Sequence, residues 1–489
     1  MNYVMPGVSF PNLFWITFPE TILEVVSLVV LVVDLGFLRK RSLAFRMTAA
    51  GALGIIGCLN AIGWLAAHSA PMALGDALVS GPIVVAAQVG ILALTVLVLL
   101  LSLREEFSRN PGEFVAIVLL ATTGMMLVTA ARDLLVIFVA LELLSLSLYV
   151  LAAFAKNRAE SAESALKYYL FGGTSAALML FGFSYLYGLT GTTSLLGIAS
   201  ALATGVASPL LIVALVMVAA GLGFKVAAFP FHLWAPDTYQ GAPAPVAALI
   251  ASGSKVASFT VLVAVTSALV TTRTSAGGAS WVVLLLWMAG ASIVLGNLAA
   301  LVQTSVRRLL AYSAIAHAGY MLLGIAAHTV QSGTAVLYYA LTYAVTTVGA
   351  FGVIAIVERG VGSATLDSFA GLSRRNPLLA GTMLVFLLSL AGIPPLIGFW
   401  AKFNLFSAVL RAQTAGAWGL GMVALALGAS AVSLYYYLQV LKRVYVVKPV
   451  SDEPLAVSPI ELGTLLFIAL AVVGMGILPG LLGQWIPLG

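Results

Sequence analysis

Apolar stretches of about twenty residues recur along nearly the whole chain, and they constrain its fold more than any other feature. One helical crossing of a membrane needs about 20 mostly apolar residues. The 489-residue chain is 62% hydrophobic and only 8% charged. The sequence therefore predicts an all-α polytopic membrane protein with a single membrane domain over residues 1–489. We expect about fourteen transmembrane helices, at residues 14–38, 47–67, 82–103, 113–130, 134–155, 165–188, 209–229, 243–270, 280–302, 308–327, 333–357, 378–408, 416–442 and 459–482.

The positively charged residues fall on alternate connecting loops. Cytoplasmic loops carry an excess of Lys and Arg. One side receives only Arg132, Arg273 and Arg411. The other side receives Arg39, Lys40, Arg41, Arg46, Arg104, Arg109, Lys156, Arg158, Arg307, Arg308, Arg359, Arg374, Arg375, Lys442, Arg443 and Lys448. This pattern predicts both termini on the periplasmic side of a bacterial inner membrane. The net charge of +6 then reflects topology rather than a nucleic-acid partner, because the chain has no basic stripe with interleaved aromatic residues.

Four lysines remain within the membrane region: Lys167, Lys225, Lys255 and Lys402. A lysine near the middle of a span costs roughly 2.5–3.5 kcal/mol on insertion scales, and such groups usually mark ion or proton paths. Four prolines lie between the second and third of these lysines: Pro230, Pro236, Pro243 and Pro245. Proline breaks the helical hydrogen bonds, which inside lipid is tolerated only where protein or water supplies other partners. We therefore expect an irregular, hydrated interior that transfers protons.

A second proline-broken segment, LAGIPPLIGFWAKFNLF, carries Lys402. The interval from Glu142 to Lys225 is 83 residues, and the interval from His317 to Lys402 is 85. Paired broken helices in two halves of a chain indicate an inverted repeat. The sequence thus predicts two inverted five-helix repeats, with helices seven and twelve broken. Helices 4–8 would occupy 111–272 and helices 9–13 would occupy 278–447, flanked by helices 1–3 in 1–110 and helix 14 in 456–489.

Glu142, in helix five, has two interpretations. It is either a structural salt bridge to a neighbouring lysine or a partner that tunes the proton affinity of Lys225. Because a carboxylate stabilises a nearby ammonium, a small motion between them would load and unload one proton. For Lys225 and Lys255, the alternative to proton transfer is snorkelling, in which the side chain extends to the lipid head groups. Snorkelling is harder for Lys255, because it lies about a dozen residues into its helix. Snorkelling is a serious alternative for Lys167, near the inner end of helix six.

Two histidines are further candidates. His317 lies in helix ten and His232 follows the break in helix seven. Histidine suits a proton relay at neutral pH, and His232 would connect Lys225 to Lys255 through water. For both, hydrogen-bonded packing is an equally weighted alternative.

Other polar and aromatic groups carry weaker signals. Glu20, Glu24 and Asp34 in helix one indicate either lateral contact with another subunit or a structural pair. An interfacial belt at an inner helix end is indicated by four tyrosines, Tyr435, Tyr436, Tyr437 and Tyr445.

The single cysteine, Cys58, excludes an intrachain disulfide and clustered cysteine ligation of iron–sulfur. We expect no metal and no nucleotide site in this chain.

Three motifs carry a resemblance to a known family. The stretches FKVAAFPFHLWAPDTYQGAPAPVAALIASGSKVASF, RRLLAYSAIAHAGYMLLG and LAGIPPLIGFWAKF resemble the antiporter-like membrane subunits of respiratory complex I, the proton-translocating NADH:quinone oxidoreductase. The resemblance covers essentially the whole chain. It implies proton transfer along a hydrated central axis between two inverted repeats. By motif, Glu142 would be the helix-five glutamate, Lys225 its helix-seven partner, Lys255 the central lysine, Lys402 the helix-twelve lysine and Lys167 an additional helix-six lysine.

The resemblance also implies partners and cofactors. The chain would hold no cofactor, whereas NADH, FMN, iron–sulfur clusters and quinone would bind in partner subunits. Its partners would be other membrane subunits of complex I, including neighbouring antiporter-like subunits, together with lipids and, indirectly, the peripheral redox arm. The alternatives are a subunit of a multisubunit sodium/proton antiporter, a complex I-like ferredoxin:quinone oxidoreductase, and a structural scaffold. A sodium site would be expected to show several carboxylates or exposed carbonyls at mid-membrane, whereas lysines outnumber carboxylates among the central groups.

Overall fold

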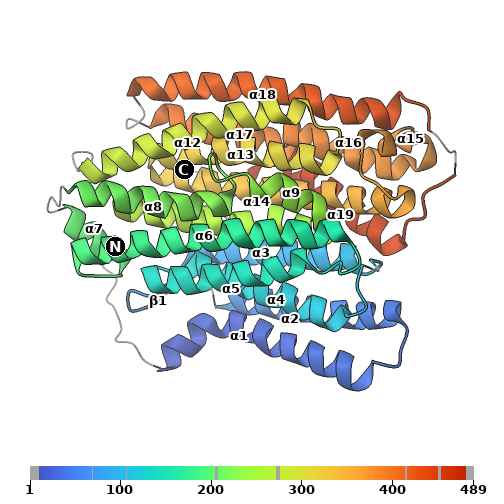
Figure 1. The fold of residues 1–489 in the computed structure, drawn as a ribbon, viewed down its shortest axis with the longest axis horizontal. Helices are drawn as coiled ribbons and strands as arrows, with labels where there is room; N and C mark the ends of the chain where they lie inside the picture. The colour runs from blue at the N-terminus through green and yellow to red at the C-terminus, as the bar shows by residue number, and fades with distance from the viewer. Residues whose placement is uncertain are drawn as a thin grey trace.

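The computed structural model describes residues 10–68, 70–105, 107–203, 208–270, 276–412, 416–449 and 453–480. In these ranges the chain is almost entirely helical, and most helices lie side by side along one direction (Figure 1). A small antiparallel hairpin, β1 (Met72–Leu74) and β2 (Leu78–Ser80), pairs Ala73 with Val79. The described residues thus confirm the predicted all-α fold.

The helices follow one another with short connections. They are α1 (Phe10–Val32), η1 (Val33–Phe37), α2 (Leu43–Ala67), α3 (Pro82–Ser102), α4 (Pro111–Ala130), α5 (Leu134–Ala152), α6 (Ala159–Thr190), α7 (Leu195–Ala203), α8 (Pro209–Val226), α9 (Trp234–Gly241), α10 (Ala244–Ala251), α11 (Gly253–Leu269), α12 (Ala276–Leu301), α13 (Val306–Ala327), α14 (Val330–Val361), η2 (Leu366–Phe369), α15 (Leu372–Arg375), α16 (Pro377–Ala391), α17 (Ile397–Arg411), α18 (Gly416–Tyr445) and α19 (Pro459–Ile477).

Thirteen helical segments in the described residues are long and apolar enough to cross a membrane. The shorter apolar helix α16, continued after a break by α17, occupies the place of the remaining predicted crossing. Proline begins several of the spans, including α3, α4 and α8. It is well tolerated there because the first turn of a helix has no use for its missing N–H.

The structure adds breaks and short helices that the hydropathy pattern did not predict. The predicted helix at 243–270 is interrupted at Ser252, which separates α10 from α11. The short helices α7, η2 and α15 lie in connections. Helix α6 begins at Ala159 instead of residue 165, which places Lys167 in its third turn.

The centre of the bundle is formed by α10, α11, α13 and α14, whose residues are buried almost throughout. In Figure 1, α1 and α2 lie along one edge of the bundle and α18 along the opposite edge. Their apolar faces are largely exposed, as expected for helices that meet lipid. The central helices carry Lys255 and His317, so these side chains lie far from the rim.

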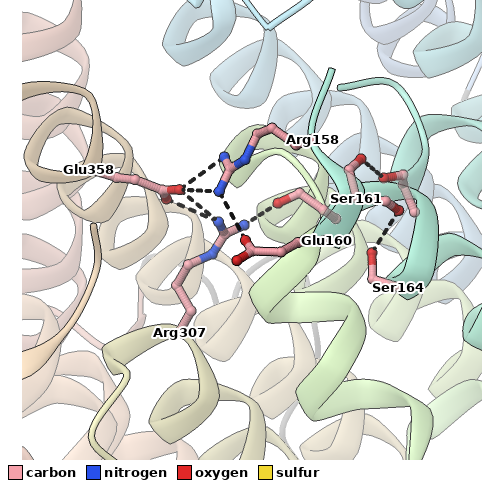
Figure 2. A network of polar contacts seen from close by, with 8 residues as sticks. Arg158, Glu160, Ser161, Ser164, Arg307 and Glu358 are labelled. Atoms are coloured by element: carbon pink, nitrogen blue, oxygen red, sulfur yellow. Dashed lines mark hydrogen bonds and ion pairs between the residues drawn. The ribbon is translucent and has the colours of Figure 1, made fainter. Parts of the chain in front are cut away.

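Ion pairs bring several of the predicted cation-rich loops together at one end of the bundle. Figure 2 shows Arg158, before α6, and Arg307, in the first turn of α13, both bound to Glu358 near the end of α14. The neighbouring Arg359 binds Glu105, after α3, at 3.2 Å. It also binds the carboxylate at the start of α19 at 2.7 Å. These contacts agree with the alternating pattern of cations, of which Arg273 lies outside the described residues.

Candidate functional site

Lys225 lies in the last turn of α8, where the helix breaks. The helix ends because Ala227 adopts a left-handed backbone conformation, with φ of 57°. The Lys225 side chain is only 6% exposed. Its Nζ donates a hydrogen bond to the Ser145 hydroxyl of α5, and lies 5.6 Å from the centre of the Tyr149 ring. The helix C-terminus, with its free carbonyls, and the ring face both favour a cation at this point.

Glu142 lies one helical turn before Ser145 on α5. Its side chain is half-buried, and its Oε1 is buried without a hydrogen-bond partner. No ion pair within 4.0 Å joins it to Lys225, whose ammonium binds the Ser145 hydroxyl instead. Glu142 and Lys225 therefore lie on neighbouring helices without an ion pair between them. The structure does not show the salt bridge that was one interpretation of Glu142.

Lys255 lies just after the interruption at Ser252, at the start of α11. It is 1% exposed, which excludes snorkelling toward head groups. Its Nζ donates to the carbonyl oxygen of Ala314 in α13 at 2.7 Å. The same ammonium lies 5.6 Å from the centre of the Tyr343 ring of α14. Lys255 thus connects three central helices through neutral groups.

His317 occupies the middle of α13 among four tyrosines: Tyr320, Tyr339, Tyr343 and Tyr437. Its Nδ1 lies 2.7 Å from the Tyr339 hydroxyl, and its Nε2 lies 3.5 Å from the Tyr437 hydroxyl. Its ring centre is 4.8 Å from that of Tyr343, the ring that also faces Lys255. The Tyr343 ring therefore lies between the histidine and the central lysine, Lys255. Both ring nitrogens of His317 have hydroxyl partners that are able to pass a proton.

The predicted aromatic belt was wrong for two of its members. Tyr436 and Tyr437 are fully buried inside the bundle, whereas Tyr435 and Tyr445 are exposed. Tyr437 hydrogen-bonds Ser313 as well as approaching His317. A helical spacing of apolar residues, with buried positions at 436, 437, 440, 441 and 444, is the signal that would have found this inward face.

Lys402 lies in α17, after the break in the second proline-broken helix. Its side chain is 7% exposed. Its Nζ donates to the carbonyl oxygen of Ala391, the last residue of α16, at 2.8 Å, and to the Ser430 hydroxyl at 2.7 Å. A small cavity with about 10 Å³ of room for the centre of a water molecule lies between Lys402 and His317. Thr346 is among its polar lining residues, so the space is suited to one bound water.

Contacts join some of the predicted site residues into a series and leave others separate from it. Lys255, His317 and Lys402 form a continuous series through Tyr343 and the small cavity. Lys225 contacts the helix of Glu142, but no hydrogen bond in the described residues joins it to Lys255.

His232 and Lys167 lie away from this series. His232 lies in the α8–α9 connection against the Phe229 ring, with a buried Nδ1 that has no hydrogen-bond partner. Lys167 is 41% exposed and ion-paired with Glu163 at 2.7 Å and with Asp237 at 2.9 Å. Its surroundings match a surface ion-pair cluster more closely than a buried carrier.

The three acidic residues predicted in helix one have separate environments, with Glu20 and Glu24 in α1 and Asp34 in η1. Asp34 forms a two-pronged ion pair with Arg46, with both N···O distances at 2.7 Å, which makes it a structural pair. Glu20 is buried and accepts a hydrogen bond from Gln88 at 3.0 Å. Glu24 is exposed on the outer face of the helix. In the described residues, no group of three or more His, Cys, Asp or Glu side chains could hold a metal ion.

This architecture, a polytopic helical bundle with broken helices and buried lysines at its centre, is that of an ion-translocating membrane protein. Residues 131–428 match the family described as NADH:quinone oxidoreductase/Mrp antiporter, TM. The chain belongs to this family, as its motifs indicated.

Relatives and solved structures agree with this membership. The chain is 47% identical to the Acidobacterium capsulatum protein named NADH-quinone oxidoreductase subunit N 2, over 99% of this chain and 100% of that protein. Its fold matches a chain of respiratory complex I from Thermus thermophilus with bound aureothin, with a TM-score of 0.79, 34% identity, and 95% and 98% of the two chains covered. It also matches a chain of the membrane-bound sulfane sulfur reductase, an archaeal respiratory membrane complex, with a TM-score of 0.84, 25% identity, and 98% and 97% covered.

Proposed function

We propose that this chain is a proton-translocating membrane subunit of a redox-driven NADH:quinone oxidoreductase, a subunit N of complex I, and that it moves protons without holding a redox cofactor. One observation carries the proposal. Lys225, Lys255 and Lys402 are each less than a tenth exposed, yet among the described residues none has a carboxylate within 4.0 Å. Burying an unpaired amine is costly, so a purely structural role would not explain three of them.

The contacts support a route with two parts. In the first part, Glu142 and Lys225 exchange a proton near Ser145, whose hydroxyl accepts from Lys225 and donates to the carbonyl oxygen of Leu141. In the second part, Lys255 passes its proton by way of His317 and the small cavity to Lys402. The gap between Lys225 and Lys255 is the step that water or a shift of the α8–α9 connection completes. His232, with its unpartnered ring nitrogen, lies in that connection.

Glu142 is the regulator in this proposal. Closing it onto Lys225 holds a proton on the ammonium, and withdrawing it lets the proton move on. The present geometry, with an unpartnered Oε1 and the ammonium on Ser145, corresponds to the open arrangement. The carboxylate is thus free to respond to a change in a neighbouring subunit.

The two broken helices support the predicted inverted repeats over 111–272 and 278–447. Both first halves, α8 and α16, end in a left-handed residue, Ala227 and Gly392 respectively. Both place an ammonium at that end: Lys225 lies in the last turn of α8, and Lys402 reaches back to the terminal carbonyl of α16. Each half therefore has the same local arrangement, a helix that ends in a left-handed residue with an ammonium group at that end.

The rest of the assembly follows from the family. We place both termini on the periplasmic side of a bacterial inner membrane, in accord with the alternating cations. Partner membrane subunits, including other antiporter-like ones, would adjoin this chain. The peripheral arm would hold FMN and the iron–sulfur clusters, oxidise NADH and reduce quinone. Lys167 would serve only as an auxiliary site at the inner end.

Substitutions in the assembled complex test the route. Lys255→Met and Glu142→Gln should lower proton pumping and coupled quinone reduction in proteoliposomes while the complex remains intact. Lys448→Met, at an exposed lysine in the α18–α19 connection, is the matched control and should change neither. A normal proton-to-electron ratio in the first two variants would remove those residues from the route.

A second candidate is a subunit of a different complex, since the same fold occurs in the sulfane sulfur reductase and the family description includes the Mrp antiporter. Purification in mild detergent separates the candidates. Subunits that carry flavin and iron–sulfur and oxidise NADH should accompany this chain. A flavin-free complex that exchanges sodium for protons, or one that oxidises ferredoxin in place of NADH, would replace the proposal.

A further inference from the structure

Two cavities lie at the cation-poor end of the bundle, and each is lined by an arginine. One has about 390 Å³ of room for water centres and is lined by Arg132, and the other has about 480 Å³ and is lined by Arg411. Both arginines belong to the side that the loop pattern leaves almost without positive charge. An arginine retained there against the general bias calls for a ligand or a partner.

Arg132 has no acidic partner in the part of the chain that the structure describes. It lies between α4 and α5, and its Nη1 donates to the carbonyl oxygens of Thr129 at 3.1 Å and Ala131 at 2.7 Å. Among the described residues no carboxylate lies within 4.0 Å of its guanidinium. The adjacent Asp133 is already engaged as the N-cap of α5 and with Thr193. Burial lowers the pKa of Arg132 to about 10, so the group is still charged at neutral pH.

The wall of the Arg132 cavity is mainly apolar and opens on the outer surface. Val263 and Ala264 of α11 and Val336 of α14 are among its lining residues. Leu196 of α7, 60% exposed, and Ile83 of α3, 42% exposed, form its rim. A single cation at the head of an apolar groove matches the two parts of a phospholipid, an anionic phosphate and a hydrocarbon chain.

We propose that the cavity lined by Arg132 binds an anionic phospholipid, with the phosphate on the guanidinium and one acyl chain along α7, α11 and α14. The Arg411 cavity does not share this character, because Gln331, Asn404 and Ser407 line it and its arginine is exposed. The inference is independent of the proton route. It has a consequence for that route nonetheless, because the bound chain would pack on α11, whose first turn carries Lys255.

Photo-crosslinking in the intact membrane complex tests the proposal. The complex is reconstituted in phosphatidylcholine nanodiscs that contain either phosphatidylglycerol or phosphatidylcholine with a diazirine on the acyl chain. Labelled peptides are then mapped by mass spectrometry. We expect phosphatidylglycerol to label α7, α11 and α14 several-fold more than phosphatidylcholine does.

Four variants separate charge from shape. Arg132→Gln should lower phosphatidylglycerol labelling about tenfold, the size of one lost charge-assisted contact, and Arg132→Lys should retain most of it. Ala264→Phe should exclude the acyl chain while leaving the arginine in place, and should therefore lower labelling by either lipid. Arg411→Gln is the matched control and should leave labelling of these three helices unchanged.

Three outcomes would overturn the inference. One is equal labelling by the two lipids in the wild type, which would mean that the arginine recognises no phosphate. Another is competition by inorganic phosphate at millimolar concentration, which would indicate a free-anion site. The last is an Ala264→Phe variant that blocks proton translocation yet keeps full lipid labelling, since the cavity would then be an aqueous path.

Discussion

Arg307 is the residue whose loss should most weaken the cation-rich end of the bundle. It is 2% exposed and lies between two halves of the chain (Figure 2). Its Nη1 donates to both oxygens of Glu358, at 3.0 and 3.3 Å, and its Nη2 donates to the carbonyl oxygen of Ala242 in the α9–α10 connection. It therefore fixes the end of the broken helix of the first half to α13 and α14 of the second.

The size of the effect follows from these contacts. Charge-assisted hydrogen bonds contribute roughly 1.5–3 kcal/mol each. Arg307→Met loses the bonds to Glu358 and the one to the Ala242 carbonyl but keeps the apolar stem, and it relieves an Nε–H that has no partner. Glu358 stays paired with Arg158, whose Nη1 lies 3.1 Å away. We therefore take the low end of the range for breaking a buried pair, about 3 kcal/mol, which is about a 150-fold change in the folding equilibrium.

Equilibrium unfolding in mixed detergent micelles, followed by limited proteolysis, measures this loss. The control is Arg158→Gln, which removes a partner of the same carboxylate from a side chain that is 44% exposed. An exposed pair contributes only about 0–1 kcal/mol. If Arg307→Met and Arg158→Gln destabilised the chain equally, burial would not be what makes this contact strong, and the reasoning would fail.

Three further substitutions have expected outcomes. Burial raises the pKa of Glu105 to about 7, although Arg359 partly opposes this. The stability that Glu105 contributes is therefore complete below its unfolded pKa of about 4.5 and is lost as pH rises through 7. Glu105→Gln should remove this loss, so that the midpoint of unfolding changes less with pH between those two values. Gly398→Ala should abolish membrane assembly, because its Cβ would lie 1.8 Å from a backbone oxygen of α16, whereas Gly381→Ala meets nothing within 4 Å and should leave the amount in immunoblotted membranes unchanged. Ser145→Ala should slow proton pumping at normal assembly, because the hydroxyl partner of the α8 lysine is lost; an unaltered pumping rate would exclude this hydroxyl from the route.

The sequence predicted the broken helices well because proline acts locally. Pro230 and Pro394 prevent helical hydrogen bonding whatever surrounds them, so the ends of α8 and α16 follow from the chain itself. The interruption at Ser252 is different. A serine next to a glycine permits a kink but does not require one, and α10 and α11 separate there only because of their packing in the bundle.

The partners of the buried amines could not be predicted from spacing. Glu142 and Ser145 lie on adjoining turns of α5, so helical periodicity admits either as the partner of Lys225. The choice depends on the depth at which α8 ends beside α5, which is a property of the packed bundle. The same holds for Tyr437, because only the contact of α18 with α13 brings its hydroxyl to His317.

The partners of the charged side chains indicate that the cation-rich end of the bundle and the buried lysines have different roles. At the cation-rich end, arginines meet carboxylates directly, as Arg359 does with Glu461 at 2.7 Å. Within the described part of the chain, the ammonium groups of Lys225, Lys255 and Lys402 meet only neutral oxygens, such as the Ser145 hydroxyl and the Ala314 carbonyl. Two opposite charges 4 Å apart attract by about 4 kcal/mol at an effective dielectric constant of 20, enough to hold a proton about a thousandfold more tightly. A scaffold gains from such attraction and would place carboxylates beside its lysines. A proton carrier must release what it binds, and for that purpose neutral acceptors, with one carboxylate held in reserve at Glu142, are the better arrangement.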